Sequence, residues 1–160
     1  MGAKEDEIRV SAQTTQTAAV CETLKRALIG RNADLAASLY ADDVELVIVN
    51  RNYPPSQALV RRGRSAALEL WQALCSKEMT HSVTATVVGK DSFAIREDCL
   101  FADGGRVVGH VIAELRDGLI SRWSHFAIFN CRLLGRITLT SCTEAIRTAG
   151  IEQYGIGKNP

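Results

Sequence analysis

The segment Arg116-Asp117-Gly118-Leu119-Ile120 joins two runs that are rich in Val, Ile and Leu, and it decides the fold class of this 160-residue chain. Asp-Gly between two such runs is a strong signal of a β-hairpin, because the dipeptide readily adopts the positive φ angles of a tight type I′ turn. We therefore predict that the strand ending at Arg116 turns back directly into a strand that starts at Leu119.

Further strands are expected on the N-terminal side of this hairpin, where β-branched and aromatic residues recur between Gly- and Asp-containing turns. The earlier run Val44 to Val49 also has strand composition. The consecutive strands are predicted at Met79 to Val88, Ser92 to Ala102, Arg106 to Arg116 and Leu119 to Cys131. Consecutive strands joined by short turns form an antiparallel meander.

Helical periodicity dominates the first part of the chain. Between Ile8 and Ile29 the apolar residues recur at three- and four-residue spacing, and Gly30 is a natural terminator. Asn32 is expected to cap a short helix from Asp34 to Tyr40, and composition predicts a third helix from Ala66 to Leu74.

The stretch from Asn50 to Arg62 should be irregular and could form a lid, because Pro54-Pro55 removes backbone donors. Helices followed by a meander indicate an α+β domain with the helices on one face of the sheet. No linker divides the chain, so we expect one domain over residues 8–142 and a partly flexible C-terminal extension over 143–160.

Composition excludes several classes of function. The formal net charge is +1 and charges of both signs are interspersed, so a nucleic-acid partner is not expected. Arg61-Arg62-Gly63-Arg64 is the only dense basic cluster and is interpreted as a solvated loop. The five cysteines lack CxxC spacing and the three histidines, at positions 81, 110 and 125, are dispersed, so neither disulfides nor a metal site is predicted.

The N-terminal sequence Met1-Gly2-Ala3-Lys4-Glu5-Asp6-Glu7 is charged and has no apolar core of a secretion signal. No apolar run is long enough to span a bilayer. A cytoplasmic protein without a membrane partner is therefore the expectation.

Two short segments carry a family resemblance. Leu39-Tyr40-Ala41-Asp42-Asp43-Val44 and the hairpin segment Arg116 to Ile120, in this order of helices and strands, resemble the SnoaL-like group of the nuclear-transport-factor-two-like cone fold over about residues 18–132. The resemblance implies a cone-shaped, strongly bent antiparallel sheet with about three N-terminal helices on its concave side. The family includes polyketide cyclases, ketosteroid isomerases, limonene-epoxide hydrolases and scytalone dehydratases, as well as members that only bind ligands or partners, so the fold does not define a reaction.

The nearest motif resemblances are to scytalone dehydratase, through His81 at the start of a predicted strand, and to limonene-epoxide hydrolase, whose Arg-x-Asp is similar to Arg96-Glu97-Asp98. The second acid of that enzyme follows a Trp on the last strand, where this chain has Trp123-Ser124-His125. Its water-holding Tyr and Asn correspond to Leu46 and Ile48. The catalytic Asp of ketosteroid isomerase would also fall near Ile48, which cannot accept a proton.

Strand alternation places Arg96 and Asp98 on one face, and the hairpin returns His125 beside the preceding strands. We predict Asp98, His125 and Arg96 as catalytic residues: Asp98 and His125 exchange protons, and Arg96 orients Asp98. A charged pair on a strand is also typical of a solvated face, which remains the alternative.

The opposite face of this strand is more apolar, since it carries Phe93, Ile95, Cys99 and Phe101. Placing Arg96 and Asp98 in the cavity therefore requires that the other face is buried as well. By resemblance to the family, we expect a second copy to cover it, giving a homodimer through the sheet.

Five aromatic or imidazole side chains are candidates for substrate binding: Tyr40, Tyr53, Trp71, His81 and Trp123. Core roles are the alternative, above all for Trp71, which has helical spacing with Leu68 and Leu74, and for His81, since neutral imidazole is often buried.

Together these features predict a small-molecule enzyme that uses cofactor-free acid–base chemistry, as hydrolase, lyase or isomerase, on a small, largely apolar metabolite. The alternative is a non-catalytic ligand-binding or interaction module of the same fold. The expected partners are the small molecule and a second copy of the chain.

Overall fold

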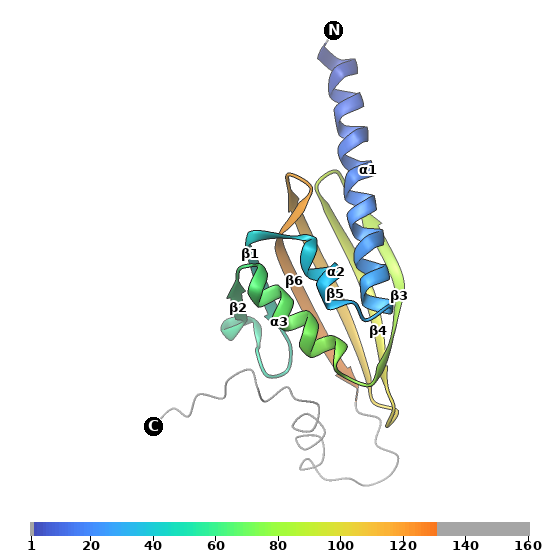
Figure 1. Cartoon of the computed structure of the whole chain (residues 1–160), viewed down its shortest axis with the longest axis vertical. Coiled ribbons are helices and arrows are strands. Elements are labelled where there is room, and N and C mark those ends of the chain that lie inside the picture. Colours follow the sequence, from blue (N-terminus) through green and yellow to red (C-terminus); the bar gives the residue numbers. More distant parts are fainter. Residues whose placement is uncertain (1, 131–160) are drawn as a thin grey trace.

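Residues 2–130 are described by a computed structural model in which three α-helices lie across one face of a curved sheet (Figure 1). The helices are α1 (Gly2–Ile29), α2 (Ala33–Ser38) and α3 (Arg64–Cys75), with a short 3₁₀ turn η1 (Pro55–Gln57). The strands are β1 (Tyr40–Val49), β2 (Leu59–Arg62), β3 (Met79–Val88), β4 (Ser92–Phe101), β5 (Arg106–Arg116) and β6 (Leu119–Asn130). The predicted extension over 143–160, and the last residues of the predicted domain, lie outside this range.

The sheet follows the order β2-β1-β6-β5-β4-β3, and β3 to β6 form the predicted antiparallel meander. Asp117 and Gly118 have φ angles of 53° and 77°, so the Asp-Gly turn between β5 and β6 has the predicted positive φ angles. The α+β class and the bent sheet covered by helices are thus confirmed.

One strand departs from the antiparallel arrangement. β1 pairs in parallel with β6, so that Leu46 lies opposite Trp123 and Ile48 opposite His125. The sheet is therefore mixed. No tight turn joins β1 to β6, so local sequence did not determine their relative direction.

The segment predicted to be an irregular lid is partly regular. Pro55–Gln57 forms η1, and Leu59–Arg62 forms β2, which pairs antiparallel with β1. Arg61 and Arg62 consequently lie in a strand and not in a solvated loop, with ion pairs to Glu69 and Glu45. The β-branched Val60 opposite Val47 favours this pairing over the loop that the prolines suggested.

The helices form as expected, with shifted ends. α1 begins at Gly2 instead of Ile8, and Asn32 caps α2 by accepting a 2.9 Å hydrogen bond from the backbone N–H of Leu35. α2 ends at Ser38, so Tyr40 belongs to β1 and not to the predicted helix. No helix within residues 2–130 is long and apolar enough to cross a membrane.

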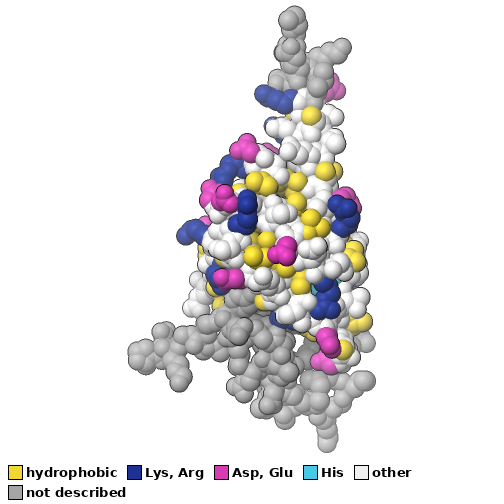
Figure 2. Space-filling view, viewed as in Figure 1, with side chains coloured by type: hydrophobic (Ala, Val, Ile, Leu, Met, Phe, Trp, Pro, Cys, Tyr) yellow, Lys and Arg dark blue, Asp and Glu magenta, His cyan; other side chains and the backbone are white. Residues whose placement is uncertain are grey.

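The core lies between the helices and the face of the sheet that they cover, which we call the inner face. The C-terminal half of α1 presents buried residues at helical spacing, packed towards β3 and β4: Thr17, Val20, Cys21, Leu24, Ala27 and Leu28. The space-filling view shows Lys or Arg and Asp or Glu interspersed on the visible face, without a large patch of one sign (Figure 2). This agrees with the charge pattern of the sequence.

Candidate functional site

The two faces of β4 carry different chemistry. Phe93, Ile95, Glu97 and Cys99 are buried on the inner face, whereas Arg96 and Leu100 are exposed on the outer face. This is the alternation of a strand with one buried side. The more apolar set of residues therefore faces the core, and the predicted orientation of Arg96 and Asp98 into the cavity is wrong.

Asp98 and His125 do not meet. Asp98 lies on the outer face, where its carboxylate forms a 3.1 Å ion pair with Arg106. His125 lies opposite Val111 on β5, a residue that is only 1% exposed and belongs to the inner face. Because the pleat separates the two side chains, they cannot share a water molecule as the prediction required.

The carboxylate that His125 contacts belongs to Glu97. The distance between His125 Nε2 and Glu97 Oε1 is 3.1 Å. Glu97 is 6% exposed, while 24% of the His125 side chain is exposed. A buried acid therefore holds an imidazole that is about one quarter exposed.

Gly109 makes this contact possible. It lies on β5 between the two partners, opposite Glu97 on one side and opposite Ala127, two residues after His125, on the other. A Cβ atom at this position would lie 2.6 Å from Glu97 Oε1 and 2.8 Å from His125 Nε2. Because Gly109 has no side chain, the side chains of Glu97 and His125 can contact each other across β5.

A second polar pair lies beside the first. His81 on β3 is directly opposite Cys99 on β4, and Cys99 Sγ is 3.2 Å from His81 Nδ1. Burial lowers the pKa of His81, whereas burial and the carboxylates of Glu97 and Asp98 raise the pKa of the Cys99 thiol to about 12. Both groups are therefore neutral at physiological pH, and the thiol can donate to the imidazole.

Three of the predicted binding residues form one aromatic cluster. The rings of Tyr40 and Trp71 both meet Trp123 edge-on, with centroid distances of 5.7 and 6.1 Å. Trp71 Nε1 donates a 3.0 Å hydrogen bond to the Tyr40 hydroxyl, and burial raises the pKa of that hydroxyl. Trp123 Nε1 is buried without a hydrogen-bond partner among the described residues.

Tyr40 and Trp71 are thus core residues by position, being 0% and 3% exposed. Tyr53 is half-buried in the turn after β1, where its backbone N–H donates to the side chain of Asn50. Of the predicted site residues, the inner face brings together His81, His125 and Trp123, and it excludes Arg96 and Asp98.

Sequence reasoning overlooked Glu97, Cys99 and Gly109 as site residues. One signal was present: Glu97 is a charged residue within the apolar set Phe93, Ile95, Cys99 and Phe101 on one strand face. A charge on the buried face of a strand needs a partner.

Comparison with known proteins supports the fold. The crystal structure described as "putative ketosteroid isomerase from Kribbella flavida DSM 17836" is 26% identical, with 78% of this chain and 91% of that chain covered at a TM-score of 0.62. An NTF2-like protein of unknown function from Mesorhizobium loti is 24% identical, with 72% and 93% covered at a TM-score of 0.63. No curated protein matches the chain. The SnoaL-like domain family matches residues 22–123, which is more than half of the chain, and this protein therefore belongs to the SnoaL-like family of NTF2-like folds.

Proposed function

We propose that the protein is an enzyme that moves a proton on a small, largely apolar molecule, with His125 as the group that accepts and returns the proton. The observation that carries this proposal is the 3.1 Å contact of His125 with the buried Glu97 across Gly109. An imidazole held by a buried carboxylate is a common arrangement for general acid–base catalysis.

The chemistry of the pair follows from its hydrogen bond. With Glu97 ionised, His125 donates its Nε2 proton to Oε1, and Nδ1 is the nitrogen that accepts a proton. Glu97 is then a positioning residue, which selects the imidazole tautomer and stabilises the imidazolium. Proton transfer by such a group contributes about 10²- to 10⁴-fold to a rate, without any need for a cofactor.

Trp123 supplies a second polar contact for a substrate. It lies two residues before His125 and therefore on the same face of β6, about 6 to 7 Å along the strand. Its Nε1–H has no partner among residues 2–130 and can donate to an oxygen of the substrate. An apolar molecule with one carbonyl or hydroxyl oxygen fits this combination of groups.

The similarity to the structure described as a "putative ketosteroid isomerase" supports the isomerase class among the three reaction types. The proton-transferring group would differ in position, because β1 offers only the apolar Ile48 beside His125. We therefore propose proton transfer next to a carbonyl as the first reaction to test, with dehydration and epoxide opening as further members of the same class.

The test is turnover of a panel that contains a β,γ-unsaturated 3-ketosteroid, a hydroxynaphthalene and an epoxide. We expect turnover of at least one substrate, and a loss of about 10²- to 10⁴-fold in kcat for His125→Gln. His110→Gln is the matched control, because His110 is exposed on the outer face. Tight binding of these compounds without turnover would overturn the proposal in favour of a non-catalytic ligand-binding module.

The outer face supports a second proposal, a homodimer through the sheet. Four large apolar side chains are exposed on neighbouring strands there: Leu100, Ile112, Phe126 and Ile128. Exposed Arg96 and Glu114 add charges of both signs to the same face, so two copies related by a two-fold axis can oppose unlike charges. The partner that we propose for this face is a second copy of the chain.

A further inference from the structure

A compact set of possible metal ligands lies on the inner face and includes Glu97, the partner of His125. His81, Glu97 and Cys99 are all buried, and their ligand atoms lie within 4.8 Å of one another. Sequence analysis predicted no metal site, because the histidines are dispersed along the chain. The pairing of β3 with β4 nevertheless brings possible ligands together, because it places His81 directly opposite Cys99.

We propose that His81, Glu97 and Cys99 bind a divalent cation of the Zn²⁺ type. Ligands at bond lengths of about 2.0 to 2.3 Å around a tetrahedral centre lie roughly 3.3 to 3.8 Å from each other. The 3.2 Å between Cys99 Sγ and His81 Nδ1 is just below this spacing, so the two groups need to separate only slightly, and the 4.8 Å limit leaves the third ligand a short movement away. Three protein ligands leave one position of a tetrahedral site open.

The charges of the three groups fit a divalent cation. Cys99 is a thiol in the absence of a cation, because burial and the nearby carboxylates disfavour the thiolate. A cation reverses that preference, and the thiol proton leaves to solvent when the sulfur binds. One thiolate and one carboxylate then neutralise the two positive charges, so the occupied site has no net charge to bury.

His81 is suited to its role as a ligand. Burial lowers its pKa, so the imidazole is neutral and carries a free electron pair at physiological pH. A set of one sulfur, one nitrogen and one oxygen favours Zn²⁺ or Co²⁺ over Mg²⁺ and Ca²⁺, which prefer oxygen ligands only.

The cation would lie next to His125. Glu97 has two carboxylate oxygens, so it can accept from His125 through one and bind the cation through the other. This inference goes beyond the proposed function, because proton transfer by His125 needs no cation. The open position would accept a water molecule or the oxygen of a substrate within reach of that imidazole.

The first test uses Co²⁺, whose bond to a thiolate gives a charge-transfer absorption in the near ultraviolet. The protein carries Cys131→Ser and Cys142→Ser, so that the thiols beyond residue 130 do not contribute. We expect stoichiometric Co²⁺ binding with a thiolate band that Zn²⁺ displaces. The band should disappear in Cys99→Ser and weaken in His81→Asn.

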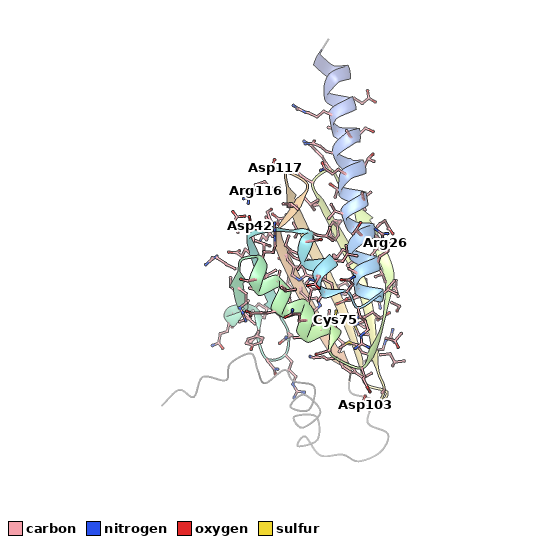
Figure 3. The ribbon with its side chains drawn as sticks, in the orientation of Figure 1. Arg26, Asp42, Cys75, Asp103, Arg116 and Asp117 are labelled. Carbon is pink, nitrogen blue, oxygen red and sulfur yellow. The ribbon has the colours of Figure 1, made fainter. Side chains whose placement is uncertain are left out.

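The matched control is Cys75→Ser. Cys75 is a half-buried thiol at the end of α3, in the helical layer of the molecule (Figure 3). It should leave the band unchanged. A band that persists in Cys99→Ser, or Co²⁺ binding below stoichiometry in the parent protein, would overturn the proposal.

A second measurement does not depend on the folding of any variant. Zn²⁺ should protect Cys99 of the parent protein from alkylation under mildly destabilising conditions, while Cys75 remains as reactive as before. Equal labelling of Cys99 with and without Zn²⁺ would contradict the site. Turnover in the presence of EDTA tests the proposed function separately, so failure of one proposal is distinguishable from failure of the other.

Discussion

Glu97 and Asp98 are neighbours in sequence, but they lie in different environments on the two faces of β4. Glu97 is buried and contacts an imidazole, whereas Asp98 pairs with an arginine that is more than half exposed. The Asp98 side chain is itself only 16% exposed, but its ion pair opens to solvent through Arg106, and a pair that water reaches contributes less than a fully buried one. A carboxylate in the interior must have a partner, and its effect on that partner is correspondingly large. The face of β4 on which a carboxylate lies, and not its residue type, therefore decides whether it is buried against an imidazole.

Neutralising each of the two acids in turn should have the largest effect on activity. We expect Glu97→Gln to lower kcat on the order of a hundredfold, with a much smaller change in KM. A neutral amide would no longer select the tautomer of the His125 imidazole or stabilise its protonated form. Asp98→Asn tests the outer face in the same way and should have an effect within a few-fold. Steady-state kinetics on both variants decide the matter. A larger loss for Asp98→Asn would return catalysis to the pair that the sequence suggested.

Gly109→Ala tests the space through which the inner pair meets. The new methyl group would lie within 3 Å of both Glu97 and His125, so we expect activity to fall together with a loss of about 1 to 3 kcal/mol in the free energy of unfolding. Denaturant titration measures the second effect.

A double variant serves as its control. Glu97→Ala removes the carboxylate that the methyl group of Gly109→Ala would meet, so Gly109→Ala should be less destabilising in that background than in the parent protein. Equal destabilisation in the two backgrounds would mean that the contact of the new methyl group with Glu97 is not the cause of the destabilisation.

On the outer face, Phe126→Lys tests the proposed dimer. Phe126 is 40% exposed and lies on the outer face, with Ile128 two residues further along β6 and Ile112 diagonally across on β5. A charge at this position should shift sedimentation from dimer to monomer while activity per chain is retained, because the substitution points away from His125. The matched control is Ile29→Lys, at a 60% exposed isoleucine at the end of α1, in the layer of helices and not on the outer face of the sheet. A parent protein that sediments as a monomer would contradict the dimer.

The smallest expected effect is the change with pH in the free energy of unfolding that is due to His81. Its pKa is lowered by burial and by Arg31, and raised in part by Glu97, so the folded protein binds this proton less readily than the unfolded chain does. The free energy of unfolding should therefore be independent of this group well above pH 6.5 and fall below it, by at most about 1.4 kcal/mol per pH unit.

Denaturant titrations at several pH values measure this slope. His81→Asn should flatten it relative to the parent protein. A slope that is the same in His81→Asn as in the parent protein would show that another group takes up the proton.

Much of the fold could be predicted because its signals are local. The Asp-Gly turn, the Asn32 cap and the bounds of β3 and β5 follow from neighbouring residues alone, and the structure confirms them. Turn geometry and helix capping need only a few consecutive residues, so no information about distant parts of the chain is required. Figure 3 shows Asp103 and Asp117 at opposite ends of the sheet, where two of the predicted turns reverse the chain.

The candidate site could be predicted only in part. His125 and His81 were identified as polar residues on strands, but their partners Glu97 and Cys99 were assigned to no site. The error arose at β4, the second strand of the meander, where the apolar pattern favoured one face and the family motif favoured the other. Burial follows the apolar pattern, because turning the strand over would place Phe93 and Ile95 in water.

The α+β class, the meander, the family and the titratable residues on the strands all follow from the order of residues along the chain. Tertiary structure decided which of them meet: the parallel placement of β1 beside β6, the pairing of His81 with Cys99, and the contact of Glu97 with His125 past Gly109. The two kinds of feature differ in the distance along the chain over which the responsible interactions act. Periodicity and turns act over a few residues, whereas a site forms where strands that are distant in sequence are brought side by side by the burial of their apolar faces.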